Sequence, residues 1–72
     1  MHVLVLGGTS EARQLAIKLD GLHGTTVTSS LAGRVADPVL PVGEVRIGGF
    51  GGVDGLREWI TEHEVTHVVD AT

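Results

Sequence analysis

The spacing of apolar residues changes along the chain, and each change marks a predicted element. Residues 2–6 form a mostly apolar run that ends at two glycines, the pattern of a strand buried on both faces of a sheet. Apolar residues then recur at the spacing of one helix face: Ala12, Leu15, Ala16 and Leu19. This stripe predicts a helix that Ser10 caps and that ends near Gly21 or Gly24.

The remaining sequence alternates between β-branched runs, turns rich in glycine or proline, and one further helical stripe. It predicts a strand at 25–29, a loop at 31–43, a strand at 44–47, a helix at 54–63 and a strand at 65–69. The loop holds two prolines and two glycines, so we expect it to return the chain along the sheet without a helix. Asp54 is the expected cap of the second helix, and Trp59 on its apolar face is expected in the core.

The order of these elements determines the fold class. Each strand after the first is reached by a crossover of about a dozen residues or more, which indicates a parallel sheet. Right-handed crossovers then give the strand order 3-2-1-4, with one helix on each face. We therefore predict an α/β fold with a Rossmann-like parallel sheet. Ligands bind such sheets beyond the carboxyl ends of the strands, at the switch point between the first and fourth strands, where Gly7 and Asp70 lie.

Composition narrows the class of partner. The chain has 72 residues, no cysteine and a formal net charge of −4, with five Lys and Arg against nine Asp and Glu. The chain is long enough for one small domain, and without cysteine it can form neither a disulfide nor a thiolate zinc site. Its excess of acidic residues argues against nucleic acid as a binding partner. No stretch approaches the roughly 20 apolar residues that cross a bilayer, and no signal peptide is visible. We expect a cytoplasmic protein with a small-molecule partner and no membrane contact.

The first junction between a strand and a helix, Gly7-Gly8-Thr9-Ser10, has two interpretations. It could cradle a phosphate, because the unpaired amides of a first helical turn point outward and glycine lets an anion approach them. It could equally be a tight turn, because Thr9 and Ala12 stand at the second and third glycine positions of the G-x-G-x-x-G fingerprint. Its position after a buried strand favours the phosphate.

The end of the second strand discriminates between coenzymes. An NAD-binding domain places Asp or Glu there, whereas an NADP-binding domain supplies Arg for the 2′-phosphate. This chain has no carboxylate in the stretch and offers Ser29, Ser30 and Arg34 instead. The pattern predicts NADP over NAD. Alternatively, Arg34 is a solvated loop charge and the serines are turn residues.

The second glycine cluster, residues 48–52, also leads from a strand into a helix. Its glycines either wrap the nucleotide or form a flexible turn. Phe50 either stacks on a base or serves as an ordinary hydrophobic anchor. His63 and His67 are four residues apart, but the helix is expected to break near Glu64, so we expect no metal site.

Four motifs in this order resemble the amino-terminal region of the precorrin-6A reductase family: LVLGGTSEARQLA, VTSSLAGR, VRIGGFGG followed by DGLREWI, and VVDAT. The resemblance covers essentially the whole chain. It implies an NADPH-dependent enzyme of cobalamin biosynthesis. In such an enzyme NADP(H) delivers hydride to a double bond of a tetrapyrrole, a corrin-ring precursor, in a cleft between two α/β domains.

The resemblance also implies which residues contact the cofactor. They are Gly7, Gly8, Thr9 and Ser10 at the first phosphate loop, Ser29, Ser30 and Arg34 at the 2′-phosphate, Gly49, Phe50 and Gly51 at the second loop, and Asp70, Ala71 and Thr72 near the nicotinamide. Family members continue past VVDAT into a His-Pro-containing segment and a second domain. We therefore expect residues 1–72 to be an N-terminal NADP-binding half-domain that is inactive without a C-terminal domain.

Two alternatives remain open at this point. The chain could be a non-catalytic module that senses NADP, or the front half of another NADP-dependent reductase. A sequence that continues into a second α/β domain favours an enzyme, whereas a stable, tightly dimeric product of 72 residues favours a sensor. No catalytic residue is identified, because hydride transfer needs positioning of cofactor and substrate more than a protein nucleophile.

Overall fold

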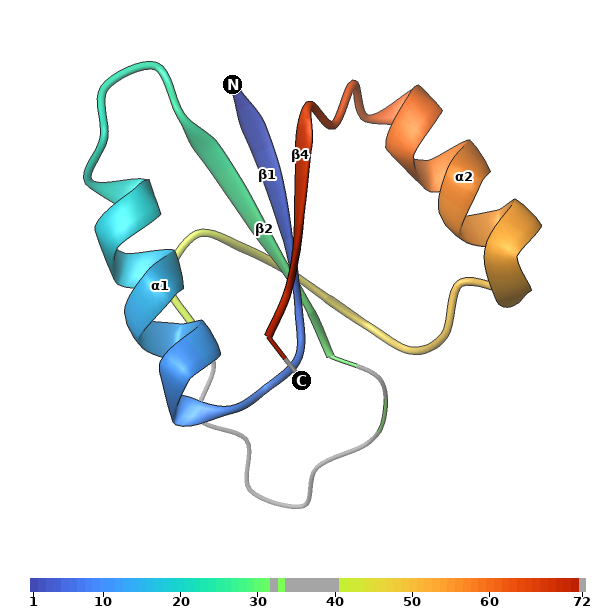
Figure 1. The fold of residues 1–72 in the computed structure, drawn as a ribbon, viewed down its shortest axis with the longest axis horizontal. Coiled ribbons are helices and arrows are strands. Elements are labelled where there is room, and N and C mark those ends of the chain that lie inside the picture. Colours follow the sequence, from blue (N-terminus) through green and yellow to red (C-terminus); the bar gives the residue numbers. More distant parts are fainter. Residues whose placement is uncertain (32, 34–40, 72) are drawn as a thin grey trace.

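The computed structural model describes residues 1–31, 33 and 41–71. This part of the chain forms six elements: β1 (His2–Leu6), α1 (Ser10–Asp20), β2 (Thr26–Leu31), β3 (Glu44–Ile47), α2 (Gly52–Glu62) and β4 (His67–Asp70). The strands pair in parallel in the order β3-β2-β1-β4. The two helices lie on opposite faces of the sheet (Figure 1). The predicted Rossmann-like α/β fold and its strand order 3-2-1-4 are therefore confirmed.

Two strands differ in their bounds from the sequence pattern, because hydrogen bonds to distant backbone decide where each one begins or ends. β2 continues to Leu31, whose carbonyl accepts a hydrogen bond of 2.8 Å from the amide of Gly48. β4 begins at His67 rather than at residue 65. The amide of Val65 instead donates to the carbonyl of Ile60 at 3.0 Å, which extends the turn after α2.

The predicted helix caps were both wrong. Thr9, not Ser10, caps α1, because its Oγ1 accepts a hydrogen bond of 3.1 Å from the amide of Ala12. The N-cap of α2 is Gly51, in the left-handed region with φ 85°, and no side chain caps this helix. Asp54 instead lies in the first turn of α2, where a carboxylate is favoured by the helix dipole.

The core of the described chain lies between the sheet and α1. Val3, Val5 and Val27 alternate along β1 and β2, so their side chains share this face and are buried. Ala12 and Ala16 meet them from α1, and their small side chains let the helix pack close to the sheet. This packing fixes the N-terminal end of α1 against the carboxyl end of β1.

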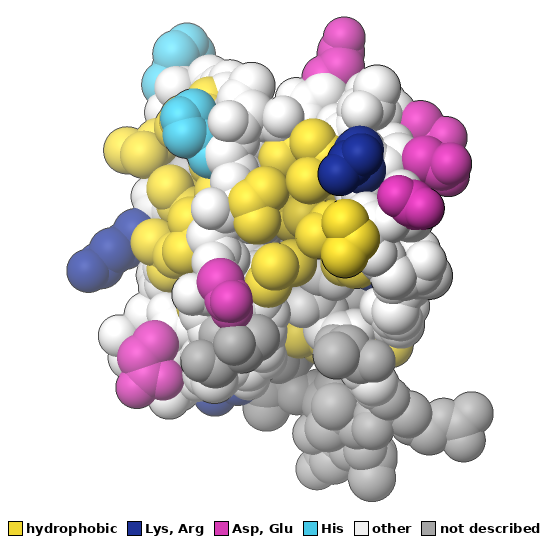
Figure 2. All heavy atoms as spheres, turned by 45° about the vertical axis from the view of Figure 1, so that its right-hand side comes forward, with side chains coloured by type: hydrophobic (Ala, Val, Ile, Leu, Met, Phe, Trp, Pro, Cys, Tyr) yellow, Lys and Arg dark blue, Asp and Glu magenta, His cyan; other side chains and the backbone are white. Residues whose placement is uncertain are grey.

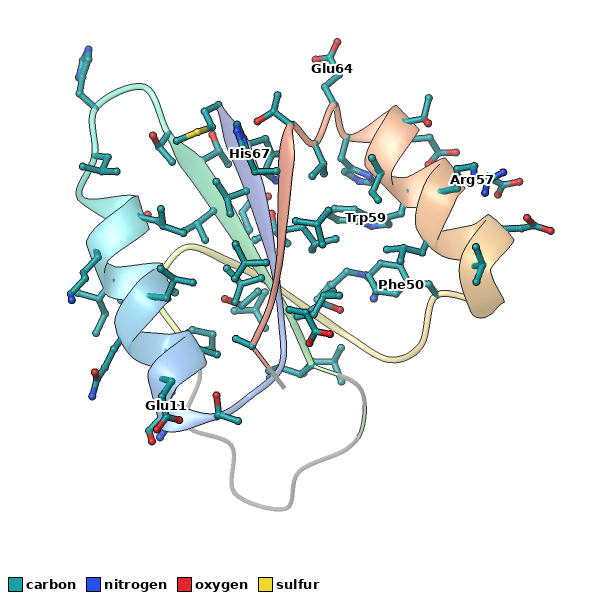
Figure 3. The ribbon with its side chains drawn as sticks, in the orientation of Figure 1. Glu11, Phe50, Arg57, Trp59, Glu64 and His67 are labelled. Atoms are coloured by element: carbon teal, nitrogen blue, oxygen red, sulfur yellow. The ribbon has the colours of Figure 1, made fainter. Side chains whose placement is uncertain are left out.

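The opposite face, under α2, is more polar and more open, and no residue of α2 is buried. Thr28 is 2% exposed; its Oγ1 lies 2.7 Å from His2 Nε2 and donates to Glu44 Oε2 at 3.0 Å. Trp59, expected in the core, is only half-buried and stacks on the ring of His63, with centroids 4.0 Å apart. Its side chain points from α2 toward the sheet (Figure 3). The ring of Trp59 also meets that of His2 on β1, with centroids 6.0 Å apart, so an aromatic contact joins α2 to the sheet.

Hydrophobic side chains gather on the side of the molecule formed by β4 and α2, with acidic side chains along one rim (Figure 2). Val68 of β4 is 45% exposed and Val53 of α2 is 71% exposed. β4 is also an outer strand of the four-stranded sheet. This side of the described chain therefore carries exposed apolar side chains from both β4 and α2.

Among residues 1–31, 33 and 41–71, no helix is long and apolar enough to cross a membrane. Within the same residues, no group of three or more His, Cys, Asp or Glu side chains is arranged to hold a metal ion.

Candidate functional site at the carboxyl end of the sheet

The corner between β1 and α1 depends on two glycines. Gly7 has φ 121°, a conformation that L side chains rarely adopt, and its amide donates to the carbonyl of Ser30 at 3.0 Å. A Cβ on Gly8 would lie 3.1 Å from Leu31 Cδ2, tighter than ordinary contact. The chain therefore turns sharply off the sheet with no side chain between its backbone and the end of β2.

Thr9 ties this corner to the end of β4. Its hydroxyl accepts from the amide of Ala12 and donates to the carbonyl of Ala71 at 2.9 Å. Because a hydroxyl has a single proton, it cannot donate a further hydrogen bond to a ligand in this arrangement. Thr9 would therefore contact an anion through its backbone, and its side chain positions the corner.

The first turn of α1 presents amides without helical acceptors. Ser10 and Glu11 are the first two residues of an 11-residue helix, so their N–H groups precede the intrahelical hydrogen-bond ladder. The helix dipole adds partial positive charge at the same place. The side chain of Glu11 is exposed and lies at this end of α1 (Figure 3). The corner can thus bind an anion with main-chain donors.

The two predicted serines of β2 have different surroundings, because successive strand residues point to opposite faces. Ser29 is 1% exposed on the α1 side, and its Oγ has no hydrogen-bond partner in the described chain. Ser30 is 5% exposed on the α2 side, and its Oγ accepts a hydrogen bond of 3.0 Å from Arg46 Nη1. Only Ser30 therefore joins a polar cluster near the carboxyl end of the strands.

Arg46 is the residue of this region that the sequence analysis missed. Its Nη1 donates to Ser30 Oγ and to the carbonyl of Gly48, both at 3.0 Å, and its Nη2 donates to the carbonyl of Gly49 at 3.2 Å. Its guanidinium carbon lies 3.7 Å from the centre of the Phe50 ring. No local sequence pattern marks it, because its contacts depend on the register Ser30↔Arg46 between β2 and β3.

A different basic residue, Arg13, contacts the β1–α1 corner. Arg13 is half-buried, and its Nη1 donates to the carbonyl of Gly8 at 3.1 Å. This hydrogen bond ties the Gly8 carbonyl to the first turn of α1. Arg13 follows Thr9 by one helical turn, a spacing at which side chains on the same helix face can meet the preceding loop.

The second glycine cluster is a turn with defined backbone requirements. Gly48, Gly51 and Gly52 have φ of 112°, 85° and 84°, so these positions favour glycine for conformational reasons. Gly49 has no such φ, and nothing lies within 4 Å of where its Cβ would be. Phe50 has the Arg46 guanidinium against its ring and meets Trp59 edge-on, with centroids 6.0 Å apart. Phe50 is thus an anchor between β3 and α2 as well as a candidate ligand contact.

Asp70 and Ala71 lie at the carboxyl end of β4, which flanks β1 on the side opposite β2. Asp70 pairs in register with Leu6, and the amide of Ala71 donates to the Leu6 carbonyl at 2.8 Å. The structure thus brings seven of the predicted residues to the carboxyl end of the sheet: Gly7, Gly8, Thr9, Ser10, Ser30, Asp70 and Ala71. Arg34 and Thr72, the remaining predicted contacts at the 2′-phosphate and near the nicotinamide, lie outside the described residues.

A sequence model of the family described as precorrin-6x reductase CbiJ/CobK matches residues 2–72. The chain belongs to this family. The resemblance seen in the four sequence motifs is thereby confirmed. The chain is 61% identical over 71 residues to the precorrin-6A reductase of Rhodococcus erythropolis, covering 99% of this chain and 29% of that protein. It is 59% identical over 71 residues to the precorrin-6A reductase of Mycobacterium tuberculosis, covering 99% of this chain and 28% of that protein.

A solved structure of a family member has the same fold. The protein named CobK precorrin-6A reductase matches all of this chain with a TM-score of 0.89 and 49% sequence identity. The match covers 28% of the solved chain. The chain therefore spans less than a third of the length of the precorrin-6A reductases it matches.

Proposed function

We propose that this chain is the coenzyme-binding part of a reductase of cobalamin biosynthesis that transfers hydride from NADPH to precorrin-6A, a tetrapyrrole. Membership of the family and the names of the relatives support the reaction and the substrate. The observation that supports coenzyme binding is the β1–α1 corner. There a buried strand is followed by two glycines and then by a helix whose first amides have no helical acceptor.

The residues of the corner fit the diphosphate of a dinucleotide. The absence of side chains at Gly7 and Gly8 leaves the backbone approachable, and the amides of Ser10 and Glu11 supply donors at the positive end of α1. Thr9 holds this end of the helix against the end of β4 through its hydrogen bond to Ala71. The donors are thus oriented before any ligand arrives, which lowers the cost of binding.

The remaining contacts are proposed by their places along the sheet, except that Arg34 and Thr72, which lie outside the described residues, are proposed from the family resemblance alone. The 2′-phosphate faces Ser30 and Arg34, with Ser29 contributing through its backbone because its hydroxyl lies on the α1 side. Gly49, Phe50 and Gly51 border the adenosine half beyond β3. Asp70, Ala71 and Thr72 border the nicotinamide half, because β4 lies on the opposite side of β1 from β2.

When bound, NADPH supplies the hydride, and the task of this chain is to bind and orient it. The rest of the protein's length, seen in the relatives, would supply the second domain and the tetrapyrrole pocket. We accordingly propose that residues 1–72 do not catalyse the reaction alone.

Calorimetric titration of the intact protein with NADPH and NADH tests this proposal. NADPH is expected to bind more tightly, and Gly8→Val is expected to weaken it at least about 10-fold, because the added side chain presses on Leu31 and displaces the backbone of the corner. The matched control is Gly21→Val at the far end of α1, where a Cβ has no contact closer than 3.7 Å; its affinity is expected to stay within about twofold. Failure of both coenzymes to bind at saturation, or equal effects of the two variants, would contradict the proposal.

A further inference from the structure

Arg46 is held by neutral groups in the described part of the chain. Its three hydrogen-bond acceptors are a serine hydroxyl and two backbone carbonyls, and its fourth contact is the Phe50 ring. All four are neutral. In the described part of the chain, the structure records no carboxylate within salt-bridge distance of this guanidinium.

Two acidic side chains of the described chain, Glu44 and Asp70, are on the same face of the sheet as Arg46. Glu44 lies two residues before Arg46 on β3, and its Oε2 accepts from Thr28. Asp70 is on β4, three strands away from β3, a separation of about 14 Å at ordinary strand spacing. Glu44 therefore shares a strand face with Arg46, but among the described residues no recorded contact joins a carboxylate to this guanidinium.

The guanidinium also retains donors for a ligand. Of its five N–H groups, the recorded hydrogen bonds use two on Nη1 and one on Nη2. One N–H of Nη2 and that of Nε remain on the planar fork of the guanidinium as donors for a phosphate. Phe50 and the carbonyls of the glycine turn fix the plane of this fork.

We propose that Arg46 is a specificity-determining residue that selects the 2′-phosphate of NADPH over the free 2′-hydroxyl of NADH. This inference rests on the proposed coenzyme function of the chain. Ser30, the hydrogen-bond partner of Arg46, is the penultimate residue of β2, near the strand end to which an NADP-binding Rossmann fold brings the adenosine ribose. The phosphate would place a negative charge beside a guanidinium whose recorded contacts within residues 1–31, 33 and 41–71 are all neutral.

The main competing explanation is that Arg46 only holds the glycine turn in place. A purely structural role would affect NADPH and NADH equally, because both coenzymes share the same adenosine and diphosphate. Selection of the 2′-phosphate would affect NADPH alone. The ratio of the two affinities, rather than either affinity, therefore separates the two roles.

The experiment uses the intact protein and its Arg46→Gln, Arg46→Lys and Arg34→Gln variants. The matched control is Arg57→Gln, which removes the same charge from an exposed position on α2 that points away from the sheet (Figure 3). Calorimetry measures the dissociation constants of NADP⁺ and NAD⁺. It also measures those of adenosine 2′,5′-bisphosphate and adenosine 5′-monophosphate, which differ only in the 2′-phosphate.

Arg46→Gln is expected to weaken NADP⁺ and the bisphosphate by about 10- to 100-fold, with NAD⁺ and the monophosphate changed less than about twofold. Arg46→Lys keeps the positive charge but loses the planar guanidinium. We therefore expect the preference for NADP⁺ over NAD⁺ to fall less than it does in Arg46→Gln. Arg57→Gln is expected to leave the ratio unchanged. If Arg46→Gln does not fold, the ratio measured with Arg46→Lys decides.

An unchanged ratio in the Arg46 variants overturns the inference, as does an equal loss of NADP⁺ and NAD⁺. If Arg34→Gln alone abolishes the preference, the selecting residue is Arg34 and the inference is wrong while the proposed function stands. If the wild-type protein binds neither coenzyme, the proposed function itself has failed. The two failures are therefore distinguishable within one set of titrations.

Discussion

Replacing Thr9 by Val tests whether this side chain holds the β1–α1 corner together. The substitution keeps the β-branched shape and removes two hydrogen bonds, one from the amide of Ala12 at 3.1 Å and one to the carbonyl of Ala71 at 2.9 Å. Loss of the helix cap costs about 1 kcal/mol, and loss of the second bond costs about 0.5–1.5 kcal/mol. We expect local opening at the N-terminal end of α1 to become easier by about 1.5–2.5 kcal/mol.

Native-state hydrogen exchange at the Ala12 amide measures this change, because that amide is the group that the Thr9 hydroxyl protects. Thr9→Ser retains both hydrogen bonds and loses one half-buried methyl group, so a change of about 0.5 kcal/mol is expected. Ser10→Ala should also stay within about 0.5 kcal/mol, because Ser10 is exposed and is not the cap. Equal protection in Thr9→Val and Thr9→Ser, or a larger loss in Ser10→Ala, would refute this account of the corner.

The second glycine turn and the α2 face of the sheet give two further predictions. Gly55→Ala normally stabilises a helix by about 1 kcal/mol, but here the new Cβ would lie 1.6 Å from the Phe50 carbonyl oxygen; thermal melts should show destabilisation of about 1–3 kcal/mol. Gly49→Ala, with no atom within 4 Å of its Cβ, serves as the control, and a Gly55→Ala melting temperature at or above wild type would count against the packing. Thr28→Val removes a hydroxyl that is 2% exposed and bonded to Glu44, so urea denaturation should show a loss of about 1–3 kcal/mol. An unchanged urea midpoint would mean that this buried network contributes nothing to stability.

The fold was predictable from sequence because the apolar spacing identifies each strand and helix separately, and the right-handed crossover rule then orders the strands. The apolar run of β1 and the stripe through Ala12 and Ala16 identify a strand and a helix face without any knowledge of their partners. Short crossovers with a fixed hand then leave few ways to order the strands. The bounds of β2 and β4 were less predictable, because they depend on hydrogen bonds between residues far apart in the sequence.

The candidate site was predictable only in part. Gly7 and Gly8 stand out because a strand, a glycine pair and a helix are consecutive in the sequence. Arg46 does not, since its role depends on the β2–β3 register and on the backbone path of the glycine turn that follows it. Thr9 was recognised as part of the loop, but its tether to Ala71 joins residues 62 positions apart, and no local pattern reports such a contact.

The most direct test of the account is a crystal structure of the intact protein grown with saturating NADP⁺. The account predicts the diphosphate oxygens about 2.7–3.2 Å from the backbone amides of Ser10 and Glu11. The adenosine ribose should then lie toward β2, and the nicotinamide toward Asp70 at the end of β4. A coenzyme that occupies another edge of the sheet, or a corner that stays empty at saturation, would contradict the central claim.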